Sequence, residues 1–275
     1  MKRRLAAAGL TLGLALCSTL WAERTIGGLY LDQNLQAGLN PVGLQLGTNL
    51  FYRMPLARKD GILWESTRID VGISNDLSPA YDFVGAYVDI EPIAVFDLAL
   101  KAQFVGYYDA LDYGFRDLAS YGSGFDSSAL KEIDDRNASG YILSAAPTFK
   151  FAFGKIAFSD TLFMNYFNVD GGEGYFYEIY GNCVLAKRDI ELYNDAYLLW
   201  VLDGGFMAGL NESLLGVPRS GYRSQTLQAV GTMNKRLSER LAVYGALTAG
   251  LYLEDRYLQY KPRVAGMVGL TYKFI

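Results

Sequence analysis

The chain has 275 residues, with 25 lysine and arginine residues against 29 aspartate and glutamate residues, and it contains no histidine. The slight excess of negative charge disfavours binding to nucleic acid, which depends on cationic contacts to phosphates. Histidine is the usual general base near neutral pH, so its absence excludes a Ser-His-Asp triad and a histidine metal site. We therefore expect no enzymatic activity, no cofactor, no bound metal and no nucleic-acid partner.

The N-terminus has the pattern of a secretory signal peptide. Lys2, Arg3 and Arg4 precede an apolar stretch over residues 5–16, and Ala22 ends a cleavage site before Glu23. The sequence thus predicts a signal peptide over 1–22 and one mature domain over 23–275. An alternative is lipidation at Cys17, although Leu16 is a poor fit directly before a lipidated cysteine.

An apolar residue at every second position is the main structural signal in the mature chain. Within residues 241–253, Leu241, Val243, Leu247 and Leu251 share one face, and a period of two predicts a β-strand with unlike faces. The same pattern predicts twelve strands: 29–39, 42–56, 62–74, 82–91, 93–108, 140–153, 155–169, 174–188, 190–203, 222–235, 238–254 and 262–275.

The predicted connections alternate between short turns and longer loops. The longest loops, 109–139 and 204–221, fall on the same side of the predicted sheet, and short turns dominate the other side. This rhythm indicates an all-β fold, a single antiparallel up-and-down transmembrane barrel of the bacterial outer membrane. Counts of ten or fourteen strands would also fit. In 155–169, Asp160 interrupts the apolar face, so we expect a β-bulge, a register shift or the opposite facing there.

The last strand carries a family resemblance. In residues 264–275, apolar residues recur at every second position, and the aromatic residues Tyr272 and Phe274 lie near the end. This segment resembles the C-terminal signature of outer-membrane barrel proteins, which end in an aromatic residue, although here Ile275 follows Phe274. The resemblance implies that the barrel-assembly machinery reads this strand as an assembly signal, and that the mature chain resides in outer-membrane lipid.

The predicted inward faces collect the charged residues, as candidates for lining a pore. They are Asp32, Arg53, Arg68, Asp70, Asp89, Asp97, Lys101, Lys150, Glu178, Glu191, Asp195 and Arg263. We expect them to line a wet pore, so that the protein is a porin-like passive channel for small hydrophilic solutes or ions, with a weak preference for cations. If they pair with one another, the lumen is closed.

The closed alternative is a non-conducting barrel that serves as an envelope scaffold or a surface-contact protein through its external loops. Loop 109–139 bears on this choice, because its aromatic residues suit either a constriction in the mouth or an outer contact surface. Cys183 lies on the apolar face of predicted strand 174–188, so we expect it to face lipid. The solute and the oligomeric state stay open at this point.

Overall fold

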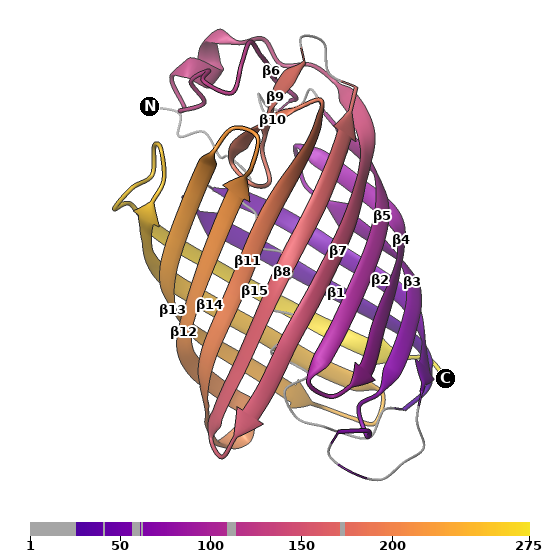
Figure 1. Cartoon of the computed structure of the whole chain (residues 1–275). Helices are drawn as coiled ribbons and strands as arrows, with labels where there is room; N and C mark the ends of the chain where they lie inside the picture. Colours follow the sequence, from indigo (N-terminus) through magenta and orange to yellow (C-terminus); the bar gives the residue numbers. More distant parts are fainter. Residues whose placement is uncertain (1–25, 41, 57–60, 62, 109–113, 171–173) are drawn as a thin grey trace.

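The protein folds into a closed barrel of twelve antiparallel strands (Figure 1). This computed structural model describes residues 26–40, 42–56, 61, 63–108, 114–170 and 174–275. The predicted signal peptide lies outside the described residues. The barrel strands are β1 (Gly28–Leu39), β2 (Gly43–Pro55), β3 (Arg68–Leu77), β4 (Tyr81–Ile93), β5 (Phe96–Tyr107), β7 (Ala138–Phe153), β8 (Ile156–Val169), β11 (Arg188–Val201), β12 (Phe206–Val217), β13 (Tyr222–Arg236), β14 (Leu241–Glu254) and β15 (Pro262–Lys273).

Each barrel strand pairs with its neighbour along the chain, and β1 pairs with β15 to close the cylinder. The closing register sets Leu35 opposite Val268. Closure pairs the backbone groups of both edge strands, which an open sheet in lipid would leave without partners. Both ends of the barrel chain meet at one mouth, where Tyr30 lies opposite Lys273. We call this mouth the terminal end.

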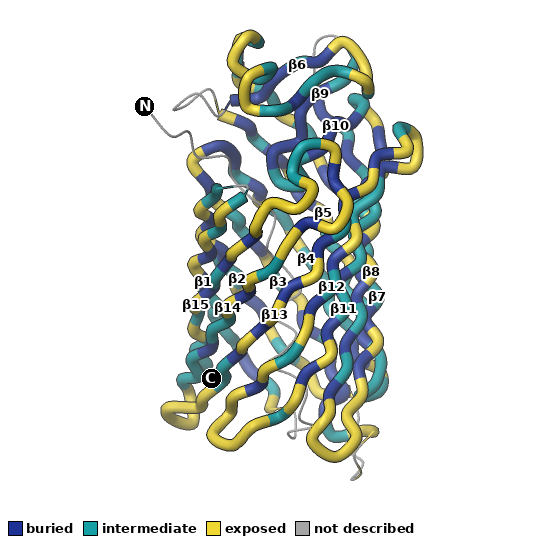
Figure 2. The backbone as a smooth tube through the Cα atoms, turned by 90° about the vertical axis from the view of Figure 1, so that its left-hand side faces the viewer, coloured by how far each residue is buried: buried dark blue, intermediate teal, exposed yellow. Residues whose placement is uncertain are grey.

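The two faces of the barrel wall differ in polarity, as the alternation predicts. Along β2, Leu44 and Leu46 are 49% and 40% exposed on the outside, whereas Gln45 between them is 4% exposed. Buried and exposed residues alternate along the wall strands (Figure 2). Many of the exposed residues are large and apolar, and many polar residues are buried. In the described part of the chain, no helix is long and apolar enough to cross a membrane.

Two of the predicted segments are corrected by the structure. Predicted strand 174–188 is not part of the wall but forms the short strands β9 (Tyr175–Glu178) and β10 (Cys183–Ala186). Predicted loop 204–221 contains wall strand β12, after one 3₁₀ turn, η3 (Asp203–Gly205). The count of twelve is confirmed because these two errors compensate.

The expected bulge, register shift or opposite facing at Asp160 was wrong. Strand β8 keeps a regular register with β11, and the Asp160 side chain lies on the outer face. It accepts a hydrogen bond from Asn194 Nδ2 at 2.6 Å. On the next strand pair, Glu212 accepts one from Gln225 Nε2 at 2.6 Å. Two outward carboxylates are thus each bonded to an amide, which reduces the cost of placing them in an apolar surface.

A small separate layer covers the other mouth of the barrel. The connection from β5 to β7 contributes β6 (Asp117–Leu118) and the 3₁₀ helix η2 (Ala129–Glu132), and the connection from β8 to β11 contributes β9 and β10. The strands form a three-stranded sheet in the order β10-β9-β6, separate from the barrel sheet. We call residues 114–137 and 174–187 the cap, and the mouth that they cover the cap end (Figure 1).

Candidate functional site

The cap is held in the mouth by a core of apolar and aromatic side chains. Phe176 of β9 is fully buried and stacks on Phe115 at 5.0 Å between ring centroids. Tyr107 of the barrel wall contacts both rings, at 5.4 and 6.4 Å. The same core includes Tyr81, Phe83, Val105, Leu118, Phe125, Ile142, Phe167, Val169, Tyr177, Ile179, Cys183, Val184, Leu185, Val217 and Tyr222. Wall and cap residues therefore pack as one apolar core at the cap end of the lumen.

A pair of buried carboxylates lies at the inner edge of this core. Glu178 of the cap accepts hydrogen bonds from the Tyr180 N–H at 3.0 Å, the Tyr107 hydroxyl at 3.4 Å and the Gly181 N–H. Glu191 of β11 accepts hydrogen bonds from Asn165 Nδ2 at 3.1 Å and the Cys183 thiol at 3.7 Å. The carboxylates and the thiol come within 4.8 Å of one another. Because each oxygen already accepts a hydrogen bond, these groups form a hydrogen-bonded junction between cap and wall.

The titration of the cap groups follows from this burial. Burial and the neighbouring Glu191 carboxylate raise the pKa of Glu178 to about 8. Burial likewise raises the pKa of the Cys183 thiol. Cys183 is fully buried in the cap, so the expectation that it faces lipid was wrong. Its strand has an apolar face because that face packs inside the mouth.

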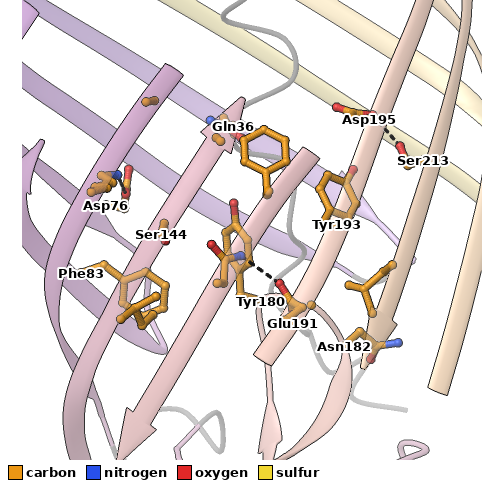
Figure 3. Close-up of a pocket in the computed structure, with 18 of the residues that line it drawn as sticks. Gln36, Asp76, Phe83, Ser144, Tyr180, Asn182, Glu191, Tyr193, Asp195 and Ser213 are labelled. Atoms are coloured by element: carbon orange, nitrogen blue, oxygen red, sulfur yellow. Dashed lines mark hydrogen bonds and ion pairs between the residues drawn. The ribbon is translucent and has the colours of Figure 1, made fainter. Parts of the chain in front are cut away.

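Below the cap lies a cavity of about 260 Å³, lined by charged, polar and aromatic side chains (Figure 3). The turn between β9 and β10 reaches it with Tyr180, Gly181 and Asn182. Its charged wall residues are six carboxylates and two basic groups, namely Asp32, Asp76, Asp89, Glu191, Asp195, Asp255, Lys101 and Arg263. The cavity is therefore rich in acceptors and in formal negative charge.

Neutral donors hold several of these carboxylates. Asp195 accepts hydrogen bonds from Asn211 Nδ2 at 2.6 Å, the Ser213 hydroxyl at 2.7 Å and the Tyr197 hydroxyl at 2.8 Å. Asp32 accepts hydrogen bonds from the Thr271 hydroxyl at 2.7 Å and the Tyr244 hydroxyl at 2.8 Å. These hydrogen bonds fix the positions of both carboxylates on the wall.

Toward the terminal end, the charged side chains pair with one another instead. Arg68 contacts Glu91 directly, and it contacts Asp70 at 3.2 Å and both Asp89 and Asp97 at 3.3 Å. Arg53 contacts Asp70 at 2.6 Å, and Lys150 contacts Glu91 at 2.9 Å. We call these seven residues the ion-pair cluster. Most of them are buried, and within the cluster three basic groups contact four carboxylates.

The twelve charged residues predicted to face inward thus separate into three groups. Six lie on the cavity wall: Asp32, Asp89, Lys101, Glu191, Asp195 and Arg263. The ion-pair cluster takes Arg53, Arg68, Asp70, Asp97 and Lys150, and shares Asp89. Glu178 belongs to the cap rather than to the barrel wall, which corrects its predicted place.

Some cavity residues were missed from the sequence. Asp76 was assigned to a loop, although it lies in β3 and contacts Lys101 at 3.0 Å. Gln36 and Gln228 were not considered, because the search for lining residues followed charge alone. Their inward position on alternating strands was the available signal. The cap turn carries no sequence signal that it enters the lumen, since that depends on tertiary packing.

Comparison with known proteins supports the fold. No family model and no curated protein sequence matches the chain. The β-domain of the Bordetella autotransporter BrkA is 13% identical, with a TM-score of 0.53, and the match covers 91% of this chain and all of that one. The transport unit of the autotransporter AIDA-I from Escherichia coli is 10% identical, with a TM-score of 0.50 and coverage of 94% and 96%. The NanC porin is 9% identical, with a TM-score of 0.40 and coverage of 90% and 100%. The closed twelve-stranded barrel, its apolar outer surface and the first two likenesses show that the chain has the fold of the β-barrel proteins of the bacterial outer membrane.

Proposed function

We propose that this protein is a non-conducting outer-membrane barrel whose cap serves as a surface-contact element. The observation that carries the proposal is the buried apolar core joining the cap to the barrel wall, with Phe115 and Phe176 both at most 1% exposed. Close-packed aromatic rings at this level of the lumen take up space that hydrated ions would need, which supports closure. The ion-pair cluster adds a second packed level toward the terminal end.

The position of the cap supports a role at the cell surface. Both ends of the barrel chain lie at the opposite mouth, and outer-membrane barrels have their long loops on the extracellular side. In this orientation the cap faces outward. Ser120, Ser127, Lys131, Glu132 and Asp134 are exposed on it and offer polar contacts to a partner. We propose no enzymatic activity, because the chain lacks a histidine base.

Solute-induced swelling of proteoliposomes tests this closure. The mature protein is compared with a variant in which residues 175–186 are replaced by a short Gly-Ser turn, which removes β9 and β10. We expect no swelling above protein-free liposomes for the mature protein in small sugars or amino acids, and rapid swelling for the variant. Heat-dependent gel mobility confirms that both barrels are folded. Swelling at equal rates with and without the hairpin would refute the closure.

A second candidate function is a passive channel with a weak preference for cations, which opens when the cap moves. The excess of carboxylates on the cavity wall favours it, since wall charge biases ion selectivity. The reversal potential of the hairpin-replaced variant in a salt gradient tests this candidate. We expect a potential on the cation-selective side, and an anion preference would exclude the candidate.

A further inference from the structure

The size of the luminal cavity limits what it can hold. Its volume is about 260 Å³, and it lies below the cap with both polar and aromatic side chains on its wall (Figure 3). For comparison, a cavity of roughly 150 Å³ engineered into another protein holds benzene, which has six heavy atoms. The cavity therefore has room for a solute of about ten heavy atoms.

The charges on the cavity wall are only partly compensated by protein groups. Lys101 is engaged by Asp76 at 3.0 Å, and Asp89 is engaged by Arg68 at 3.3 Å. Among the ion pairs of the described residues, none includes Asp32, Glu191, Asp195 or Asp255. Arg263, the other basic group, lies over the ring of Tyr252 at 5.7 Å and attracts the Asp195 carboxylate, so its charge offsets one of the six carboxylates. Buried charges require a partner, so this excess of carboxylates favours a cationic occupant.

Two buried amide oxygens on the same wall also need a donor. Gln36 and Gln228 are 4% and 3% exposed, and in the described part of the protein their Oε1 atoms have no hydrogen-bond partner. Their Nε2 groups are already engaged, since Gln36 donates to Asn34 at 2.8 Å and Gln228 donates to Asn211 at 3.1 Å. An unsatisfied buried acceptor costs free energy, so an occupant that brings N–H donors is favoured over one that brings acceptors.

Aromatic rings complete the wall between the polar groups. Phe83, Tyr87, Phe163 and Tyr193 line the cavity, and Phe163 and Tyr193 lie 5.7 Å apart between ring centroids. Such rings pack against methylene groups and attract cations to their faces. The occupant that fits this wall has an apolar middle and cationic donor groups.

We propose that the luminal cavity binds a short aliphatic diamine, with its ammonium groups on the wall carboxylates and amide oxygens and its methylene chain against the aromatic rings. Asp32 and Asp195 lie on β1 and β11, at separate parts of the barrel wall, so one cation can meet carboxylates at both of its ends. This inference goes beyond the proposed surface role, because it concerns the lumen and holds whether or not the barrel conducts.

Isothermal titration of the folded, detergent-solubilised mature protein tests this inference, with 1,4-diaminobutane as the probe. The matched control ligands are 1,4-butanediol and succinate, which keep the four-carbon chain but carry no charge or negative charge. We expect saturable binding of one diamine per barrel and no saturable binding of either control. Because the cap covers one mouth, the diamine retained per barrel is also measured by mass spectrometry on protein refolded in the presence of the diamine and then dialysed.

Variants of single carboxylates locate the site. We expect Asp195→Asn and Asp32→Asn each to weaken diamine binding at least about tenfold, because each removes a charge-assisted hydrogen bond. The matched control Asp203→Asn, on an exposed residue outside the cavity, should bind as the parent protein does. The inference is overturned if neither preparation binds the diamine, if butanediol binds equally well, or if Asp203→Asn weakens binding as much as the cavity variants. Swelling or currents measured without diamine report only on closure, so failure of the closure proposal is distinguishable from failure of this inference.

Discussion

Truncation of Phe176 should loosen the cap without dismantling the barrel. Its ring is fully buried and contacts Phe115 and Tyr107 at 5.0 and 6.4 Å. A buried Phe→Ala change typically costs about 3–5 kcal/mol. This residue stabilises the closed cap and lies outside the barrel sheet, so we assign the cost to cap opening. At about 1.4 kcal/mol for each factor of ten, Phe176→Ala should raise the open fraction by about two to three orders of magnitude.

Modification of Cys183 by a water-soluble maleimide measures this opening. Without residues 1–22, Cys183 is the sole cysteine of the chain, and it is fully buried in the same core. When the cap closes faster than the reagent reacts, the modification rate follows the open fraction. The matched control is Phe153→Ala, which truncates a phenylalanine that is 84% exposed at the opposite mouth.

We expect slow modification in the parent protein and the Phe153→Ala control, and a rate about 10²- to 10³-fold higher in Phe176→Ala. Heat-dependent gel mobility must show that all three barrels are folded. The reasoning is refuted if Phe176→Ala and the parent react at the same rate, or if the parent already reacts as fast as a free thiol in solution.

Three further predictions concern charge and assembly. The pKa of Glu178 is raised from 4.5 to about 8, so cap stability should be greatest below pH 4.5 and fall as pH rises toward 8. The open fraction of the cap should therefore rise by at most about tenfold per pH unit. Glu178→Gln should flatten this dependence, seen as the ratio of Cys183 modification rates of parent and variant at each pH, and an unchanged slope would contradict it. Arg68→Ala leaves the buried Glu91 and its neighbouring carboxylates short of positive charge, and it should cost about 3–5 kcal/mol in urea unfolding. Lys101→Ala, which breaks one partly exposed pair, should cost less, and equal losses would argue against the cluster as a unit. Phe274→Ala should lower the fraction of folded barrel in outer-membrane preparations but leave the stability of the refolded protein unchanged. Normal assembly of this variant would show that Phe274 is not part of the assembly signal.

The two-residue period made the wall strands predictable, because successive wall residues point alternately to the outer surface and to the lumen. Strand β2 was predicted nearly to its ends for this reason. The same rule misassigned residues 174–188, since a hairpin packed inside the mouth also buries one apolar face. Strand β12 was missed because Gly204, Gly205 and the outward Glu212 resemble a loop. The hydrogen bond from the Gln225 side-chain amide to Glu212 joins two neighbouring strands, so the sequence of one segment does not reveal it.

For the candidate site, the sequence predicts only which strand residues point into the lumen. Asp32 and Asp195 follow from alternation, and the structure places both on the cavity wall. Their separation from the ion-pair cluster depends on barrel register, which sets Arg68 opposite Glu91 and Asp70 opposite Asp89. The sequence left open whether loop 109–139 enters the mouth or forms an outer contact surface, because the core joins Phe115, Phe176 and Tyr107 from three distant segments. Such long-range packing leaves no local signature in the sequence.

The current across a planar bilayer, after insertion of the refolded mature protein, tests the central claim most directly. With folding confirmed by heat-dependent gel mobility, the capped barrel should leave the bilayer silent, and the variant with residues 175–186 replaced should give discrete current steps. Discrete steps of the same size from the intact protein would show an open lumen and contradict the closure by the cap.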